Sequence, residues 1–199
     1  IVAVGKNYAD HAKEMGSEVP KEPIIFLKPN TSVIGPGDTI VWPAMAPTID
    51  YEAELAVVIG RVCKDVPKER VHEVIFGYTL ANDVTCRELQ KSDGQWARAK
   101  GFDTFCPLGP WIETDFIPGS QKVMTTLNGE VKQSEPLTSM IFSIPEIVEF
   151  VTSVMTLLPG DVILTGTPAG IGPMQAGDTV TVSIDGLGSL SNKISPRAH

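Results

Sequence analysis

The chain has 199 residues, of which 42% are hydrophobic and 20% are charged, a composition typical of a soluble globular protein. Its formal net charge of −8 argues against nucleic acid as a partner, because a phosphate backbone requires a basic surface. No apolar run reaches the roughly 18 residues that a membrane-spanning helix needs. We therefore expect a protein with neither nucleic-acid nor membrane partners, folded as a single domain over residues 1–199.

The number and spacing of the cysteines indicate the cellular compartment. The chain has three of them, Cys63, Cys86 and Cys106, and no C-x-x-C pair. An odd number without metal-ligand spacing predicts neither a disulfide framework nor a structural zinc site. No signal peptide is visible at the N-terminus. These features predict a cytoplasmic protein.

Short β-branched runs alternate with turn residues in the first half of the chain. Residues 1–5 predict a strand, and residues 7–15 a short polar helix with a plausible cap. Further strands are expected at residues 24–28, 39–42, 52–59 and 77–82, with a helix at residues 68–74 after Pro67.

The second half continues the same pattern. Residues 122–127 predict a strand, Asn128-Gly129 a tight hairpin turn, and residues 130–132 the returning strand. A helix is expected to open at Ser143, where a capping Ser is followed by Pro and Glu. Strands follow at residues 161–165 and 179–184, and Gly-Asp turns at residues 35–38, 158–161 and 175–178 resemble one another.

The most informative segment places Glu52 and Glu54 two positions apart at the start of an apolar strand. Because side chains alternate along a strand, both carboxylates point to one face, with Cα atoms about 6.6 Å apart at roughly 3.3 Å per residue. Two like charges repel unless a cation lies between them, and Mg²⁺ or Mn²⁺ prefers such oxygen ligands. The alternative is an acidic edge strand exposed to solvent.

A third carboxylate, Asp83, ends the strand predicted at residues 77–82, with Arg87 and Gln90 just beyond. A polar cluster at a strand end is typical of a functional site. The alternative is that Asp83 caps a helix over residues 84–90. The local sequence does not bring Asp83 to the two glutamates.

The acidic triad and several other segments together resemble the fumarylacetoacetate hydrolase superfamily. The similar segments are residues 5–11 (GKNYADH), 26–29 (FLKP), 85–90 (TCRELQ), 98–103 (RAKGFD) and 164–172 (LTGTPAGIG), in the family's order over nearly the whole chain. The stretch between Gln90 and Lys100 is shorter than in animal acylpyruvases; because this region borders the site, the resemblance does not define the shape of the substrate pocket. The glycine-rich stretch 166–172 has neither the glycine spacing of a dinucleotide-binding site nor that of a P-loop.

The resemblance implies a fold and a cofactor. The fold would be α+β and β-rich, a mixed β-roll or β-sandwich with a few flanking helices. The whole of residues 1–199 would form a catalytic domain, which would act as a homodimer. Glu52, Glu54 and Asp83 would bind Mg²⁺ or Mn²⁺.

The resemblance also implies roles for several side chains. Lys100 would reach the oxygens of a small 2-oxo acid substrate as a cation, although a surface lysine is the alternative. Substrate contacts are expected from the polar side chains Lys28, Arg87, Gln90 and Thr167, and Arg87 has a structural ion pair as its alternative.

The first predicted helix carries a candidate general base. His11 and Glu14 lie three positions apart, so they share one helix face. A histidine beside a carboxylate suits general base catalysis near neutral pH, and the resemblance places this helix in a lid. A plain surface helix is the alternative.

Three reactions fit a stabilised pyruvate enolate. The pair of His11 and Glu14 favours hydrolysis of a C–C bond in an acylpyruvate. Oxaloacetate decarboxylation is the second candidate, and isomerisation of an unsaturated 2-oxo diacid from aromatic catabolism the third. A non-catalytic binding protein with the same fold is the alternative from another class.

Overall fold

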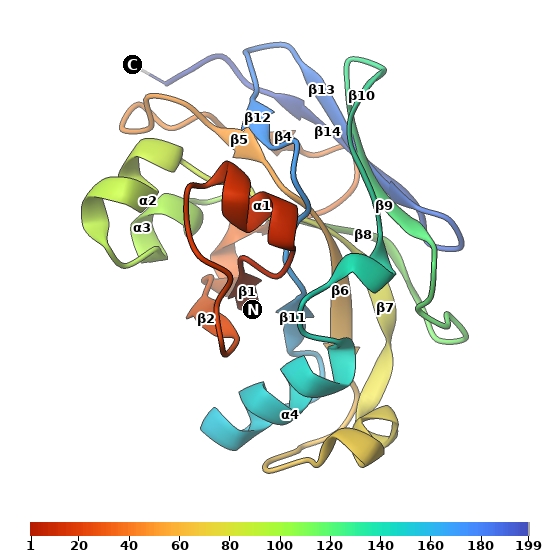
Figure 1. The fold of residues 1–199 in the computed structure, drawn as a ribbon. Helices are drawn as coiled ribbons and strands as arrows, with labels where there is room; N and C mark the ends of the chain where they lie inside the picture. The colour runs from red at the N-terminus through yellow and green to blue at the C-terminus, as the bar shows by residue number, and fades with distance from the viewer. Residues whose placement is uncertain (199) are drawn as a thin grey trace.

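The computed structural model describes residues 1–198, which form two main sheets with few helices (Figure 1). The first sheet has seven strands in the order β2 (Ile24–Leu27), β1 (Val2–Gly5), β11 (Val162–Leu164), β6 (Ala53–Ile59), β7 (Ile75–Asn82), β8 (Cys106–Glu113) and β3 (Val33–Ile34). The second has five, in the order β10 (Glu130–Pro136), β9 (Lys122–Leu127), β13 (Thr179–Ile184), β14 (Gly188–Ile194) and β4 (Thr39–Ile40). This strand-rich arrangement confirms the predicted fold class.

The remaining elements are short. A two-stranded sheet pairs β5 (Asp50–Tyr51) with β12 (Gly172–Pro173). The α-helices are α1 (Ala9–Glu14), α2 (Arg87–Asp93), α3 (Ala97–Lys100) and α4 (Ile144–Val154), and 3₁₀ segments span Asn30–Ser32, Lys68–Glu73 and Leu137–Ser139. None of the helices among residues 1–198 is long and apolar enough to cross a membrane.

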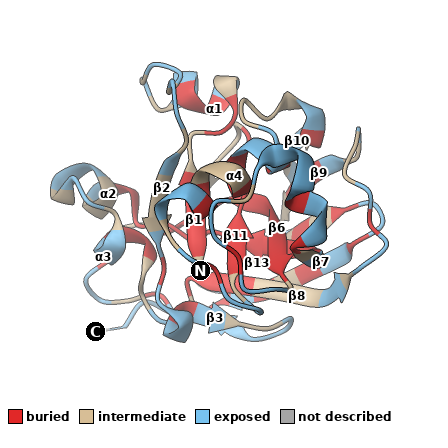
Figure 2. Ribbon diagram, turned by 90° about the horizontal axis from the view of Figure 1, so that it is seen from below, coloured by how far each residue is buried: buried red, intermediate tan, exposed pale blue. Residues whose placement is uncertain are grey.

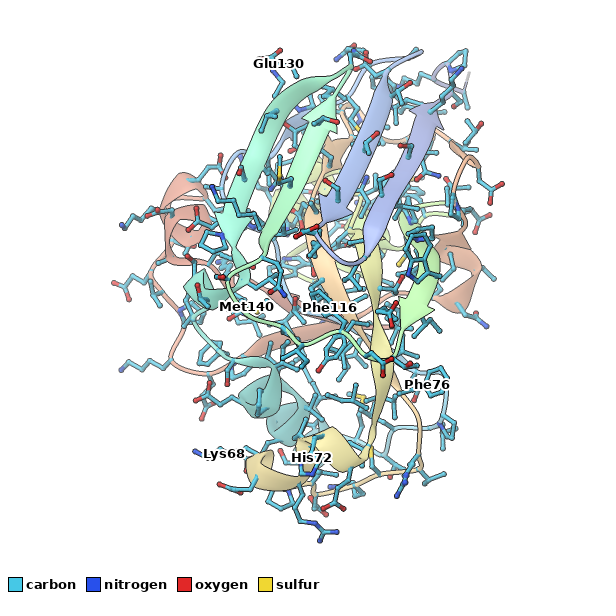
Figure 3. The ribbon with its side chains drawn as sticks, turned by 90° about the vertical axis from the view of Figure 1, so that its right-hand side faces the viewer. Lys68, His72, Phe76, Phe116, Glu130 and Met140 are labelled. Atoms are coloured by element: carbon cyan, nitrogen blue, oxygen red, sulfur yellow. The ribbon has the colours of Figure 1, made fainter. Side chains whose placement is uncertain are left out.

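The central strand β6 is buried along its whole length (Figure 2). Its residues Leu55 and Val57 belong to the main core, together with Ile147 and Val151 of α4. The second sheet covers one end of the long strands, and α4 lies near the 3₁₀ segment of Lys68 and His72 at the other end (Figure 3). Because side chains alternate along β6, Glu54 points to the opposite face from Leu55.

The hairpin between β9 and β10 forms as predicted and contains a bulge. Asn128 and Gly129 both have positive φ, 52° and 85°, as a type I′ turn requires. The pairing register then shifts between Val131 and Gln133. Val131 is 52% exposed, whereas Gln133 is buried. The bulge thus turns Gln133 to the inner face, which regular alternation from Val131 would not do.

The predicted Gly-Asp turns share one geometry. In each turn an aspartate oxygen accepts the backbone N–H three residues earlier: Gly35 to Asp38 at 2.8 Å, Leu158 to Asp161 at 2.7 Å and Gln175 to Asp178 at 2.7 Å. The glycine between them adopts positive φ in all of these turns. The repeated turn chemistry is therefore confirmed.

Several local expectations differ from the structure. The first helix has Tyr8 as its N-cap without a side-chain capping bond, because Asn7 is used elsewhere and donates to the carbonyls of Phe142 and Thr165. The helix expected at residues 68–74 is a 3₁₀ segment. The alternative that Asp83 caps a helix is wrong, since α2 begins at Arg87 after Cys86. In contrast, the capping pair predicted at the start of α4 is present, because the backbone N–H of Ser143 donates to a carboxylate oxygen of Glu146 at 2.8 Å.

Candidate metal centre and active site

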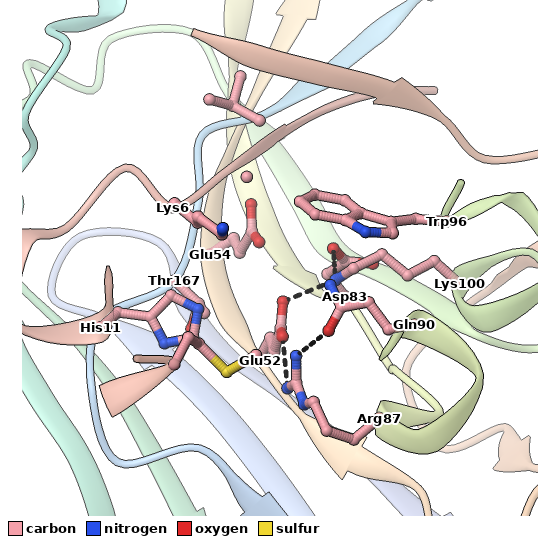
Figure 4. Close-up of a pocket in the computed structure, with 13 residues that line it drawn as sticks. Lys6, His11, Glu52, Glu54, Asp83, Arg87, Gln90, Trp96, Lys100 and Thr167 are labelled. Carbon is pink, nitrogen blue, oxygen red and sulfur yellow. Dashed lines mark hydrogen bonds and ion pairs between the residues drawn. The ribbon is translucent and has the colours of Figure 1, made fainter. Parts of the chain in front are cut away.

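The three predicted carboxylates converge. Oxygen atoms of Glu52, Glu54 and Asp83 lie within 4.8 Å of one another, and all three residues are buried (Figure 4). The antiparallel pairing of β6 with β7 accounts for this, because Ala53 at the start of one strand lies opposite Asn82 at the end of the other. The backbone N–H of Asp83 also donates to the carbonyl of Glu52 at 2.8 Å. An exposed acidic edge strand is excluded.

Buried cations surround two of these carboxylates. The Nζ atom of Lys100 donates to Glu52 at 2.8 Å, to Asp83 at 2.6 Å and to the hydroxyl of Thr85 at 2.8 Å. Lys28 bonds to the other oxygen of Asp83 and donates to the carbonyl of Phe105 at 2.7 Å. Both lysines are only 2% exposed, so neither is a surface side chain. The three bonds of Lys100 use all of its N–H donors.

Arg87 is held by three partners. Its Nη2 donates to Glu52 at 2.7 Å, its Nε to Asp50 at 3.1 Å and its Nη1 to Gln90 at 2.6 Å. Burial alone would raise the pKa of Glu52, but the charges of Lys100 and Arg87 outweigh burial and lower it below the ordinary value. Glu52 is therefore an anion in this environment.

Glu54 has a different environment. It accepts the backbone N–H of Gly166 at 2.6 Å, and no basic side chain within residues 1–198 pairs with it. Burial raises the pKa of Glu54 well above its ordinary value, and the negative charges of Asp83 and Glu52 raise it further. An oxygen-only donor set with one uncompensated carboxylate fits a hard divalent cation. The triad could therefore hold a metal ion.

The pocket over the triad brings together most of the other predicted residues. His11, Arg87, Gln90, Lys100 and Thr167 all line it. In Figure 4, His11 and Thr167 lie on one side of the carboxylates and Lys100 on the other. The remaining predicted contact, Lys28, is buried against Asp83 and does not line this pocket.

The helix α1 places the histidine and glutamate as expected. The Nδ1 atom of His11 lies 3.2 Å from Oε2 of Glu14, and His11 is 4% exposed. The other oxygen of Glu14 accepts the backbone N–H of Gly170 at 3.1 Å. When Nδ1 of His11 is the donor in this hydrogen bond, it carries the ring proton, and Nε2, which makes no hydrogen bond within residues 1–198, is an acceptor. Buried against the pocket, His11 is not part of a plain surface helix.

The sequence analysis missed several residues around the site. Asp50 orients Arg87, Thr85 accepts a bond from Lys100, and Lys6 and Trp96 line the pocket. A Cβ atom on Gly5 would lie 2.5 Å from the Trp96 ring, so glycine is required for that close approach. The signal available in the sequence was the proximity of Asp50 to Glu52 and of Thr85 to Asp83.

The chain is similar to several known proteins. The family model for the fumarylacetoacetate (FAA) hydrolase C-terminal domain matches residues 1–195. The crystal structure of 5-carboxymethyl-2-hydroxymuconate delta-isomerase from Mycobacterium smegmatis is 55% identical with a TM-score of 0.93, covering 100% of this chain and 78% of that one. Oxaloacetate tautomerase YisK of Bacillus subtilis is 44% identical over 207 residues, 98% of this chain and 69% of the relative.

A further solved structure includes a metal ion. Fumarylpyruvate hydrolase from Pseudomonas aeruginosa, in complex with Mn²⁺ and pyruvate, is 32% identical to this chain with a TM-score of 0.92. The similarity covers 98% of this chain and 88% of that one.

Proposed function

The chain belongs to the fumarylacetoacetate hydrolase family, and from that premise we propose that it is a Mg²⁺- or Mn²⁺-dependent hydrolase that cleaves a C–C bond in an acylpyruvate-type 2-oxo acid. The observation that carries this proposal is the 3.2 Å contact of Glu14 with His11, because His11 lines the same pocket as the acidic triad. Other family members named above are an isomerase, a hydrolase and a tautomerase.

Glu52, Glu54 and Asp83 would hold the cation, and when bound it would supply positive charge to a substrate on which negative charge develops. Lys100 donates to both Glu52 and Asp83 and so holds these two carboxylates close together. A contact between Lys100 and the substrate would require one of its three present bonds to be exchanged. Arg87, Gln90 and Thr167 would bind and orient the substrate from the pocket wall.

His11 would act as the general base. Its Nε2 would take a proton from a water molecule, whose oxygen attacks the distal carbonyl carbon. The C–C bond then breaks, its electron pair remains with the pyruvate fragment, and the acyl fragment leaves as a carboxylic acid. The proton held on Nε2 is transferred to the carbon that carried the broken bond, which completes pyruvate. Glu14 keeps the Nδ1 proton in place through both steps.

Isomerisation is the second candidate function. It is favoured by the 55% identity to a delta-isomerase, because a base that moves a proton without activating water would give that outcome in the same pocket. Hydrolysis divides the substrate into two products, whereas isomerisation keeps all of its carbon atoms in one product.

A substrate panel tests the proposal. Wild-type protein with Mg²⁺ is offered acetylpyruvate, fumarylpyruvate, oxaloacetate and a carboxymethyl-hydroxymuconate-type compound. We expect pyruvate release from an acylpyruvate, abolished by EDTA and in Glu52→Ala. Spectral change without release of pyruvate or CO₂ would support the isomerase instead. Release of CO₂ from oxaloacetate alone would support a decarboxylase, and no turnover of any compound would support a binding protein.

We also propose that residues 1–199 act as one catalytic domain and that the protein is a homodimer. Light scattering of the purified protein tests the second point, and a monomer mass would contradict it.

A further inference from the structure

A buried amide lies beneath the pocket wall. Gln133 is 1% exposed, and the bulge in β10 turns it inward opposite Thr125. Its Oε1 accepts from the backbone N–H of Ala53 at 3.1 Å and from the Thr125 hydroxyl at 2.6 Å. Its Nε2 donates to the Thr167 hydroxyl at 2.9 Å and to the Pro168 carbonyl at 2.8 Å. Both ends of the amide are therefore fully bonded.

The orientation of this amide is determined by its partners. The backbone N–H of Ala53 can only donate, so it must face the oxygen of Gln133. The carbonyl of Pro168 can only accept, so it must face the nitrogen. A flipped amide would place two donors together at one end and two acceptors together at the other, each leaving a buried group unsatisfied.

This orientation determines what the Thr167 hydroxyl can do. Its oxygen receives an N–H of Gln133, so its own proton must point away from Gln133. Within residues 1–198, no other hydrogen bond of this hydroxyl is formed, and Thr167 lines the pocket. The hydroxyl thus keeps a proton that it can donate away from Gln133, and it belongs to a residue that lines the pocket.

We propose that Gln133 is a positioning residue that makes the Thr167 hydroxyl a hydrogen-bond donor toward the pocket, so that the site selects a ligand with an anionic oxygen at that point. The same amide bonds Ala53, which lies between Glu52 and Glu54, and so joins this part of the wall to the triad. The ligand class, a carboxylate, rests on the proposed function; the direction of the hydrogen bond does not.

The decisive variants are Gln133→Glu and Thr167→Val. Glutamate at position 133 keeps an oxygen for Ala53 and Thr125 but offers at most one donor where glutamine offers two. When that donor is absent or bonds Pro168, the Thr167 proton turns toward the new carboxyl group and away from the pocket. Gln133→Met, which removes both donors at similar length, serves as a second variant at this position.

Oxalate binding to Mn²⁺-loaded protein, measured by calorimetry, gives a readout that needs no turnover. Binding of Mn²⁺ alone and circular dichroism report whether each variant retains its fold and metal site. We expect Thr167→Val and Gln133→Glu each to weaken oxalate binding about tenfold, the usual effect of losing one hydrogen bond to a charged group. The double variant should be at most about twofold weaker than either single variant, because both changes remove the same bond.

Two results would overturn the proposal. If the effects of Gln133→Glu and Thr167→Val multiply in the double variant, Gln133 acts independently of the hydroxyl. If Thr167→Val binds oxalate as tightly as wild type, no donor acts there, whatever the variants at position 133 do. Should oxalate bind as expected while no compound of the substrate panel reacts, the proposed function fails and this inference stands.

Discussion

The backbone N–H of Gly166 lies 2.6 Å from Oε2 of Glu54 and is the donor that holds this carboxylate in place. Glu52 and Asp83, in contrast, each pair with buried basic side chains. The protein thus compensates two charges of its acidic triad, whereas no basic side chain in the described part of the chain pairs with the third. Without a cation, the buried and unpaired carboxylate of Glu54 destabilises the folded state.

Replacing Glu54 with glutamine should therefore stabilise the metal-free protein. Glutamine keeps an oxygen for the Gly166 N–H and removes the unpaired charge. At pH 8 we expect the free energy of unfolding to rise by about 1–3 kcal/mol, the range for neutralising an unpaired buried group, while Mn²⁺ affinity falls at least tenfold. Urea unfolding and calorimetry measure these changes. Glu130→Gln, at an exposed position, is the matched control, and a less stable Glu54→Gln protein would contradict the prediction.

The difference in unfolding free energy between Glu54→Gln and wild type should change with pH in a definite direction. Because the pKa of Glu54 is raised in the folded chain, the folded state binds more protons than the unfolded state at pH values above the ordinary pKa of 4.5. The contribution of Glu54 to the stability of the metal-free wild type is thus lost as the pH rises above that value. We expect the advantage of Glu54→Gln in urea unfolding to grow from pH 5 to pH 8. A constant difference would show that burial does not shift this group.

Removing the buried ammonium of Lys100 should destabilise the protein. Lys100→Met leaves Glu52 and Asp83 without their shared partner, so we expect a loss of about 3–5 kcal/mol, the usual result of breaking a buried ion pair. Added Mn²⁺ should restore part of it. Lys13→Met, which removes an exposed ion pair to Asp10, should change stability by less than about 1 kcal/mol. Equal effects of the two substitutions on urea unfolding would contradict the prediction.

Asp50 should matter through Arg87. It accepts the Nε bond that keeps the guanidinium directed at Glu52 and Gln90. We expect Asp50→Asn to raise KM about 3- to 10-fold with a smaller change in kcat, and Arg87→Lys to cost more, because an ammonium cannot serve three divergent partners. Steady-state kinetics on the best panel substrate measures both. A larger loss in Asp50→Asn than in Arg87→Lys would show that Asp50 acts on its own.

The parts of the site that the sequence predicted are those with a local signal. Glu52 and Glu54 lie two positions apart at the start of an apolar run, and Asp83 follows another, so alternation and strand boundaries indicated them as candidates. In the structure Glu54 lies in β6, whereas Glu52 comes just before β6 and Asp83 just after β7. That the three carboxylates meet is a non-local fact, which only the family resemblance implied. The burial of Lys28 and Lys100 against the triad likewise depends on distant segments.

Other features were hidden because their cause is not local. β8 contains Pro107, Gly109 and Pro110, residues that normally argue against a strand, and its place in the sheet comes from pairing with β7. Gln133 would face solvent beside Val131 in a regular strand, and only the bulge turns it inward. A pattern with period two cannot reveal a residue whose role depends on a break in that period.

The final prediction separates the reactions that one pocket could support. The ring of His11, with Nδ1 on Glu14, is the candidate that activates water, whereas loss of CO₂ from oxaloacetate needs no water as nucleophile. His11→Ala should lower acylpyruvate hydrolysis by about 10²–10⁴-fold, the range for a general base, and change oxaloacetate decarboxylation much less. Glu14→Gln should lower hydrolysis less than His11→Ala, because the amide oxygen can still accept a hydrogen bond from the Nδ1–H of His11. Pyruvate and CO₂ release are followed in parallel, and if neither rate changes in His11→Ala, the base lies elsewhere.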